Sequence, residues 1–216
     1  MADKVRRTDS TGSQLTTAVA VVASGYVLYH LWTKWITPRP SVRMDSINVY
    51  PVKSCRGFQV DSWPISKYGL QHDREWMIYN PKTMRFVCQR QVHTICLITA
   101  KVVIDGDRDR PTICLSAPGM APISVPAVIS EKHKLDDVVL WRDKVNGIDQ
   151  GDAIAEWLTR YIDKGREYRL MRISDTIYSR VTDPKYTPPE LRGKSHASYA
   201  DGFPYLGVWR IYPLYF

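Results

Sequence analysis

The residues best suited to bind an anion lie in two short segments. Lys53 and Ser54 stand in YPVKSCRG, directly after a strand-like run, and Arg74 stands in GLQHDREW, directly before another. An ammonium beside a hydroxyl can hold a phosphate, and a guanidinium offers a planar fork for phosphate or carboxylate oxygens. Taken alone, these residues are more simply explained as a solvated lysine and a surface Asp73–Arg74 ion pair.

Other polar candidates are weaker. Arg90 and His93, in FVCQRQVH, come one strand later. They either line the same end of the sheet as Lys53 and Arg74 or have only a structural role. DGDRD (residues 105–109) departs from a calcium loop, because Arg110 stands where Gly is needed and Ser116 where Glu is needed. The cysteines show no metal-binding or redox spacing and are expected to be free structural thiols: Cys55, Cys88, Cys96 and Cys114.

The elements that must position these residues are mainly short strands. Apolar and polar positions alternate in runs that turn residues separate, as in a half-buried antiparallel sheet or barrel. The runs are 44–52, 57–63, 75–80, 85–90, 95–105, 112–117, 121–126 and 167–173. Residues 151–163 instead space their apolar side chains like a helix packed over one end of the sheet. The polar, proline-rich residues 183–200 predict a loop.

The N-terminal part predicts a membrane anchor. From Thr11 to Thr33 no residue carries a formal charge, and such a run is long enough for a helix to cross a bilayer of about 30 Å. We therefore expect a tail at 1–13, a single transmembrane helix at 14–36 and a linker at 37–43. A signal peptide or a buried soluble helix is the alternative. Basic residues flank both ends, so the loop charges do not fix an orientation.

The net charge of +8 favours an anionic partner, such as a phosphate, a nucleic acid or a membrane surface. The lysines and arginines are spread along the chain and form no basic tract. This distribution argues against nucleic-acid binding.

The combined motifs resemble a known family. INVYPVKSCRGFQV, GLQHDREWMIY and RFVCQRQVHTICLI, followed by GIDQGDAIAEWLTRYI and SYADGFPYL, are similar to the N-terminal β-barrel region of MOSC proteins. The similarity extends over roughly residues 44–206. With an apolar segment before it, the chain resembles the mitochondrial amidoxime-reducing components within that family.

This resemblance implies a mainly β (α+β) fold, with a MOSC N-terminal β-barrel at 44–180 and a packed helix. It implies a molybdenum–molybdopterin cofactor contacted by Lys53, Ser54 and Arg74. It also implies reduction of N-hydroxylated compounds such as amidoximes, and in some members of nitrite. Electrons would come from an NADH-dependent flavin reductase through a b-type cytochrome. The protein would sit in the outer mitochondrial membrane, in contact with lipid, with its domain facing the cytosol.

The resemblance fades toward the C-terminus. Residues 181–206 match the start of the family's catalytic domain, whereas the tail at 207–216 is divergent. The family's molybdenum-ligating cysteine has no counterpart here, so no residue is assigned to the metal and none to catalysis. We therefore expect an incomplete site with little or no reductase activity.

Two alternatives to a reductase stay open. One is a non-catalytic, anchored β-barrel that binds an anionic ligand or acts as a decoy. The other is the MOSC end of a cofactor sulfurase, which would need a large pyridoxal-phosphate domain upstream. We rank the sulfurase last, because an apolar segment stands upstream instead.

Overall fold

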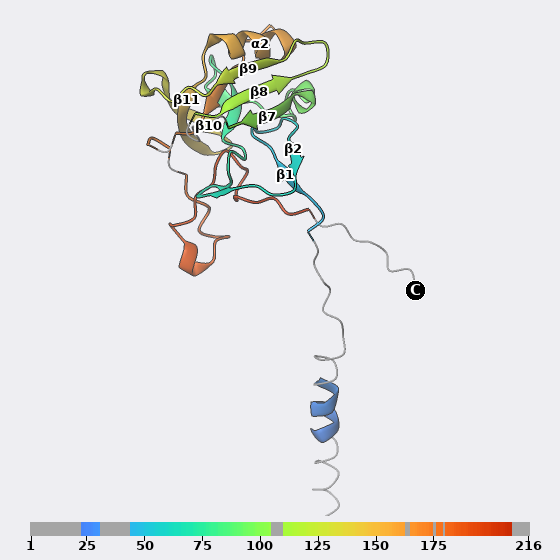
Figure 1. Ribbon diagram of the computed structural model, residues 1–216. Coiled ribbons are helices and arrows are strands. Elements are labelled where there is room, and N and C mark those ends of the chain that lie inside the picture. The colour runs from blue at the N-terminus through green and yellow to red at the C-terminus, as the bar shows by residue number, and fades with distance from the viewer. Residues whose placement is uncertain are drawn as a thin grey trace, which may run out of the picture. The chain divides into compact units, whose positions relative to one another are not determined.

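Five strands form a closed barrel, of which β10 (Lys134–Leu140) and β11 (Asp143–Asp149) are labelled in Figure 1. The computed structural model describes residues 23–30, 44–104, 110–162, 165–174, 176–178 and 180–208. The strands follow one another in the order β10, β11, β12 (Arg169–Arg172), β5 (Trp76–Asn80) and β6 (Arg85–Phe86). Neighbours are antiparallel except β6 and β10, which close the barrel through a parallel Arg85–Val139 pair. The predicted mainly β fold with a barrel is confirmed.

A three-stranded antiparallel sheet lies beside the barrel. It consists of β7 (Thr99–Val103), β8 (Thr112–Ser116) and β9 (Ile123–Pro126). Helix α2 (Asp152–Ile162) packs on β9 and β12, and buries Ile154, Trp157 and Leu158. The predicted apolar stripe is therefore the face that meets the core.

The remaining elements are short. β1 (Ile47–Val49) pairs with β2 (Phe58–Val60), and β3 (Ile65–Ser66) pairs with β4 (Gly69–Leu70). The 3-10 helices are η1 (His93–Leu97), η2 (Glu131–His133) and η3 (Pro189–Leu191). Outside η3, residues 183–200 contain no regular helix or strand, as the loop prediction states.

Two apolar clusters form the core. One lies between the three-stranded sheet, α2 and β5, and includes Trp76, Ile113 and Leu158. The other fills the barrel and includes Met77, Tyr79, Val138, Met171 and Tyr199. β5 alternates its side chains between the two clusters, because successive residues of a strand point to opposite faces. This strand therefore ties the barrel to the neighbouring sheet.

The sequence reading missed the longest strands. β10 and β11 contain several charged residues, and a bulge between Leu135 and Val138 interrupts their pairing. Asp137 takes a positive φ of 59° at that bulge. The apolar alternation is broken there, so its period does not stand out. At the start of the predicted strand 95–105, residues 95–97 instead belong to η1.

The predicted transmembrane helix is wrong for the part of the chain that the structure describes. There, no helix is long and apolar enough to cross a bilayer. Residues 23–30, the part of the predicted span that the structure describes, are helical. The rest of the predicted span, 14–22 and 31–36, lies outside the described residues. The chain divides between Asp45 and Ser46 into two compact units; residues 23–30 belong to the first, and all the labelled strands and helices belong to the second.

Candidate anion site

A tight turn positions Lys53 and Ser54. The amide of Cys55 donates to the carbonyl of Val52 at 3.1 Å, and Ser54 takes a positive φ of 69° inside this turn. The turn is fastened to β5, because the Lys53 amide donates to the carbonyl of Trp76 at 2.9 Å. Lys53 is consequently buried although its side chain is charged, and Ser54 is half-buried.

Arg74 lies next to this turn, although 20 positions separate it from Ser54. Its amide donates to the carbonyl of Tyr50 at 2.7 Å, and the amide of Tyr50 donates to the Asp73 carboxylate at 2.8 Å. These bonds place residues 50–53 alongside residues 74–76. Arg74 has a positive φ of 52°. Such backbone conformations cost roughly 1–3 kcal/mol each and cluster at functional sites.

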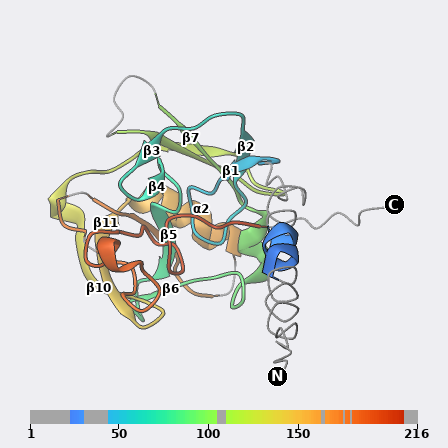
Figure 2. The same ribbon diagram turned by 90° about the horizontal axis from the view of Figure 1, so that it is seen from below.

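One segment of the C-terminal part contacts both cations. We call residues 198–204 the strap; it runs past the start of β5 (Figure 2). The Asp201 carboxylate accepts a short hydrogen bond from Lys53 Nζ and another, of 2.9 Å, from the Trp141 indole. Arg74 Nη2 donates to the carbonyl of Pro204 at 2.6 Å. The structure thus brings Lys53 and Arg74 to one strap.

Two further arginines complete the positive charge here. Arg180 donates to the carbonyls of Ser198 and Ala200, and its Nε donates to Asp143 at 2.9 Å. The guanidinium of Arg90 lies 4.9 Å from the centre of the Trp141 ring. Arg90 therefore joins the site as the sequence suggested. His93 lies exposed at the start of η1, and no described contact joins it to this cluster.

Burial and charge oppose each other at the Lys53–Asp201 pair. Burial lowers the pKa of Lys53, and the positive charges of Arg180 and Arg74 add to this, although Asp201 acts in the other direction. Burial acts to raise the pKa of Asp201, but the hydrogen bonds from Lys53 and Trp141 outweigh it and the pKa is lowered. The pair with Asp201 therefore favours the charged form of Lys53 and opposes the effect of burial.

A buried acid–base group lies behind the site. His72 Nδ1 and Glu75 Oε2 are 2.9 Å apart, and Arg172 contacts the same carboxylate at 3.3 Å. Burial acts to raise the pKa of Glu75, but the bonds from His72 and the charge of Arg172 outweigh it and lower the pKa. This group links the residues that precede β5 to Arg172 at the end of β12.

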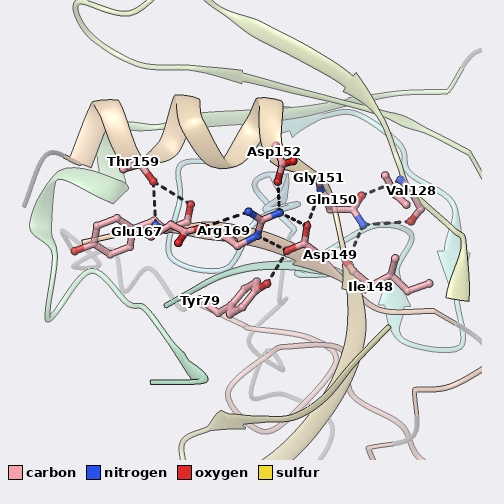
Figure 3. A network of polar contacts seen from close by, with 11 residues as sticks. Tyr79, Val128, Ile148, Asp149, Gln150, Gly151, Asp152, Thr159, Glu167 and Arg169 are labelled. Carbon is pink, nitrogen blue, oxygen red and sulfur yellow. Dashed lines mark hydrogen bonds and ion pairs between the residues drawn. The ribbon is translucent and has the colours of Figure 1, made fainter. Parts of the chain in front are cut away.

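A second polar network lies outside the site, around Asp149 (Figure 3). Arg169 grips Asp149 with two hydrogen bonds of 2.8 and 2.7 Å, and Tyr79 donates to Asp149 at 2.6 Å. Arg169 also reaches Asp152, the first residue of α2, at 2.8 Å. The network therefore ties the start of α2 to the barrel strands and has a structural role.

The donors of the anion site suit the phosphate and the oxygen-rich pterin of molybdopterin. The Nε of Arg74 is buried without a hydrogen-bond partner, so it has a donor to offer. Lys53 and Ser54 lie on the adjacent turn, which backbone hydrogen bonds hold beside residues 74–76. The site is less suited to ligate a metal. The adjacent thiol is that of Cys55, and burial raises its pKa, which disfavours the thiolate that a metal needs. The described residues contain no group of three metal-binding side chains.

Residues 41–165 match the family described as the MOSC N-terminal beta barrel domain. The chain belongs to this family. The match covers more than half of the sequence and contains both the Lys53 turn and Arg74.

Individual relatives of this MOSC chain carry two kinds of name. A molybdenum cofactor sulfurase of Bos taurus is 32% identical over 77% of the chain. The mitochondrial amidoxime reducing component 2 of Rattus norvegicus is 28% identical over 89% of it, and component 1 of Xenopus laevis is 27% identical over 74%. The resemblance to MOSC proteins is thereby confirmed, and the chain belongs to a molybdenum-related enzyme family.

The MOSC chain spans only part of these relatives. The matched region is 17% of the bovine sulfurase, 59% of the rat protein and 46% of the Xenopus protein. The similarity therefore concerns one region of these relatives, and the activities of the whole relatives come to this chain only as proposals.

The sequence reading missed three residues of the site: Trp141, Arg180 and Asp201. They lie 88 or more positions after Lys53 and reach it only through the folded barrel. Asp201 stands in SYADGFPYL, which carries the family resemblance, but nothing local marks it as the partner of Lys53. Trp141 has a positive φ of 57°, which no local residue pattern indicates for a bulky side chain.

Proposed function

We propose that this chain binds the phosphate and pterin part of the molybdenum cofactor at Lys53, Ser54 and Arg74. The observation that carries the proposal is the convergence of two cations from separate segments onto one place, where the Arg74 Nε is buried and has no partner. Positive φ at both Ser54 and Arg74 supports it, because strained backbone is maintained where function requires it.

Each residue has a distinct role in this proposal. Lys53 supplies a positive charge in a partly dry environment, where its attraction for phosphate is stronger than in water. Arg74 supplies a planar donor held in place by Asp73 at 2.6 Å. Ser54 supplies a hydroxyl that can donate to a phosphate or pterin oxygen. When bound, the cofactor would supply the two-electron redox chemistry of molybdenum.

The complete protein that uses this domain is proposed to be a reductase of N-hydroxylated compounds. Two electrons and two protons break the N–O bond of an amidoxime and release the amidine and water. A b-type cytochrome and its NADH-dependent flavin reductase would supply the electrons. Support comes from the rat and Xenopus relatives, which are named amidoxime reducing components.

A non-catalytic anion-binding module is the second candidate. The observation in its favour is the state of Cys55, which is buried and has a raised pKa beside the very turn that holds Lys53. A domain with this arrangement offers charge and hydrogen bonds to a ligand but no thiolate for the metal at that place.

Elemental mass spectrometry and pterin fluorescence on the purified full chain test the proposal. The chain should be produced in cells that make the cofactor. Pterin at a substantial fraction of the protein concentration supports cofactor binding, and molybdenum in equal amount supports the reductase. Pterin without molybdenum favours the non-catalytic module. Absence of pterin, from a chain that folds by circular dichroism, contradicts both cofactor roles.

We also propose that the protein associates with mitochondria. The names of the rat and Xenopus relatives support this location. Fractionation of cells that express the tagged full chain measures it directly. Co-sedimentation with a mitochondrial marker is the expected result, and recovery in the soluble fraction alone contradicts the proposal.

A further inference from the structure

The acid that contacts Lys53 sits on the outer side of the anion site. Asp201 bonds the Lys53 ammonium, yet the Asp201 side chain is 69% exposed while that of Lys53 is 7% exposed. The carboxylate is therefore accessible to solvent and the ammonium is not. An anion that approaches Lys53 from solvent meets Asp201 first.

The strap around Asp201 is held by backbone contacts that do not involve its carboxylate. Tyr199 donates its amide to the carbonyl of Arg74 at 3.0 Å, and the Ser198 hydroxyl donates to the carbonyl of Asp73 at 2.9 Å. Arg180 holds the carbonyls of Ser198 and Ala200. The Asp201 side chain can consequently rotate away from Lys53 while the strap stays in place.

We propose that Asp201 is a displaceable internal ligand that occupies the anion position of Lys53 until a phosphate replaces it. This inference rests on the proposed function, since it concerns the same site. A phosphate monoester carries a charge of about −1.5 to −2 near pH 7 and three acceptor oxygens, against one negative charge and two oxygens on Asp201. The exchange is therefore favoured for phosphate and disfavoured for monoanions such as acetate or chloride.

Release of the Asp201 carboxylate from Lys53 costs little free energy. Exposed carboxylates are well solvated and their ion pairs contribute little to stability. Trp141 loses its hydrogen bond to Asp201 in the exchange, so its indole N–H reports directly on the displacement. The groups that face the exchange from neighbouring elements are Arg74, Arg90 and Arg180, all positive.

Calorimetric titration of the full chain with inorganic phosphate tests the proposal. Asp201→Asn removes the competing charge and should tighten phosphate binding about fivefold or more, within the usual range of coupled sites. Asp137→Asn is a matched control, because Asp137 is also exposed and pairs with a lysine, Lys144, at 3.2 Å. The control should stay within about twofold of the wild type, as for other exposed ion pairs.

The NMR resonance of the Trp141 indole distinguishes displacement of the Asp201 carboxylate from a general effect of the charge that Asp201→Asn removes. The 15N–1H signal that disappears in Trp141→Phe identifies the Trp141 indole. In the wild type, phosphate should shift this signal. In Asp201→Ala the same signal should respond much less, because alanine has no side-chain oxygen to accept the indole hydrogen bond. Equal or weaker phosphate binding by Asp201→Asn, or an unmoved indole signal in the saturated wild type, overturns the inference. If Lys53→Met leaves wild-type phosphate binding unchanged, the proposed anion site itself fails, which is a different result.

Discussion

At the scale of single residues, Lys53 lies in surroundings that disfavour its charged form. Burial lowers its pKa, and Asp201 offsets part of that effect. A lysine that is buried beside one carboxylate and two arginines is poorly explained as a stability device, because desolvation of charge is costly. A ligand with more negative charge than a carboxylate would offset the excess positive charge, which is the reason for proposing phosphate here.

A different pair, Asp149 with Arg169, is expected to be stabilising. We predict that Asp149→Asn lowers the free energy of unfolding by about 2–4 kcal/mol at pH 7, since it breaks a largely buried bidentate pair. Asp152→Asn is the control: this carboxylate shares Arg169 but is 84% exposed, so its removal should cost less than about 0.5 kcal/mol. Urea denaturation of the two variants measures both values.

The Asp149 effect should depend on pH. Burial acts to raise the pKa of Asp149, but hydrogen bonds from Arg169 and Tyr79 outweigh it, so the pKa is lowered in the folded state. A lowered carboxyl pKa stabilises the fold above the unfolded value of about 3.9, and this contribution is lost as the pH falls through the folded value. The difference between wild type and Asp149→Asn should therefore shrink at pH 3. An unchanged difference would contradict this assignment.

At the scale of elements, the helix prediction was the most secure. Its apolar stripe has the helical period, and α2 buries that stripe against the sheet. We predict that Leu158→Ala, at a fully buried position, lowers the unfolding free energy by about 2–5 kcal/mol. Glu156→Ala, on the exposed face of the same helix, should change it by less than about 0.5 kcal/mol. Similar losses in both variants would show that the helix does not pack as described.

The contact between β11 and the strap makes a second prediction at this scale. A Cβ on Gly147 would lie 2.4 Å from the Tyr199 hydroxyl and 2.8 Å from the carbonyl of Arg172. Gly147→Ala should therefore destabilise the protein by about 1–3 kcal/mol and loosen the strap. Gly202→Ala is the control, because a Cβ there meets no atom within 4 Å. Thermal unfolding measures the cost, and equal melting temperatures for the two variants would contradict the packing.

The sequence indicated most elements outside the barrel hairpin. In strands β7 and β8 buried positions alternate with half-buried or exposed ones, and this period is visible in the residues. β10 and β11 were missed because charged residues and the bulge at Asp137 hide that period. The alternation of Val138 and Leu140 is a weak local signal, and Trp141 and Arg142 between the strands are not residues typical of a hairpin turn.

At the scale of the whole molecule, the barrel explains how distant residues form one site. Local chemistry pointed to Lys53, Ser54 and Arg74, and the family resemblance strengthened that choice. Asp201, Trp141 and Arg180 could not be predicted from local pattern, because long-range strand pairing and the path of the strap bring them there. The same limit applied to the N-terminal segment, where length and charge alone suggested a bilayer span that the described residues do not support.

The pterin content of matched lysine variants tests the central claim most directly. The full chain, Lys53→Met and Lys101→Met should be purified in parallel from cells that make the cofactor, and their pterin measured by fluorescence per folded protein. Lys101 is an exposed lysine of β7, so its variant controls for the loss of one positive charge. The account predicts that Lys53→Met loses pterin by about tenfold or more, which corresponds to one charge-assisted contact, while Lys101→Met keeps the wild-type amount. Wild-type pterin content in Lys53→Met would contradict the account.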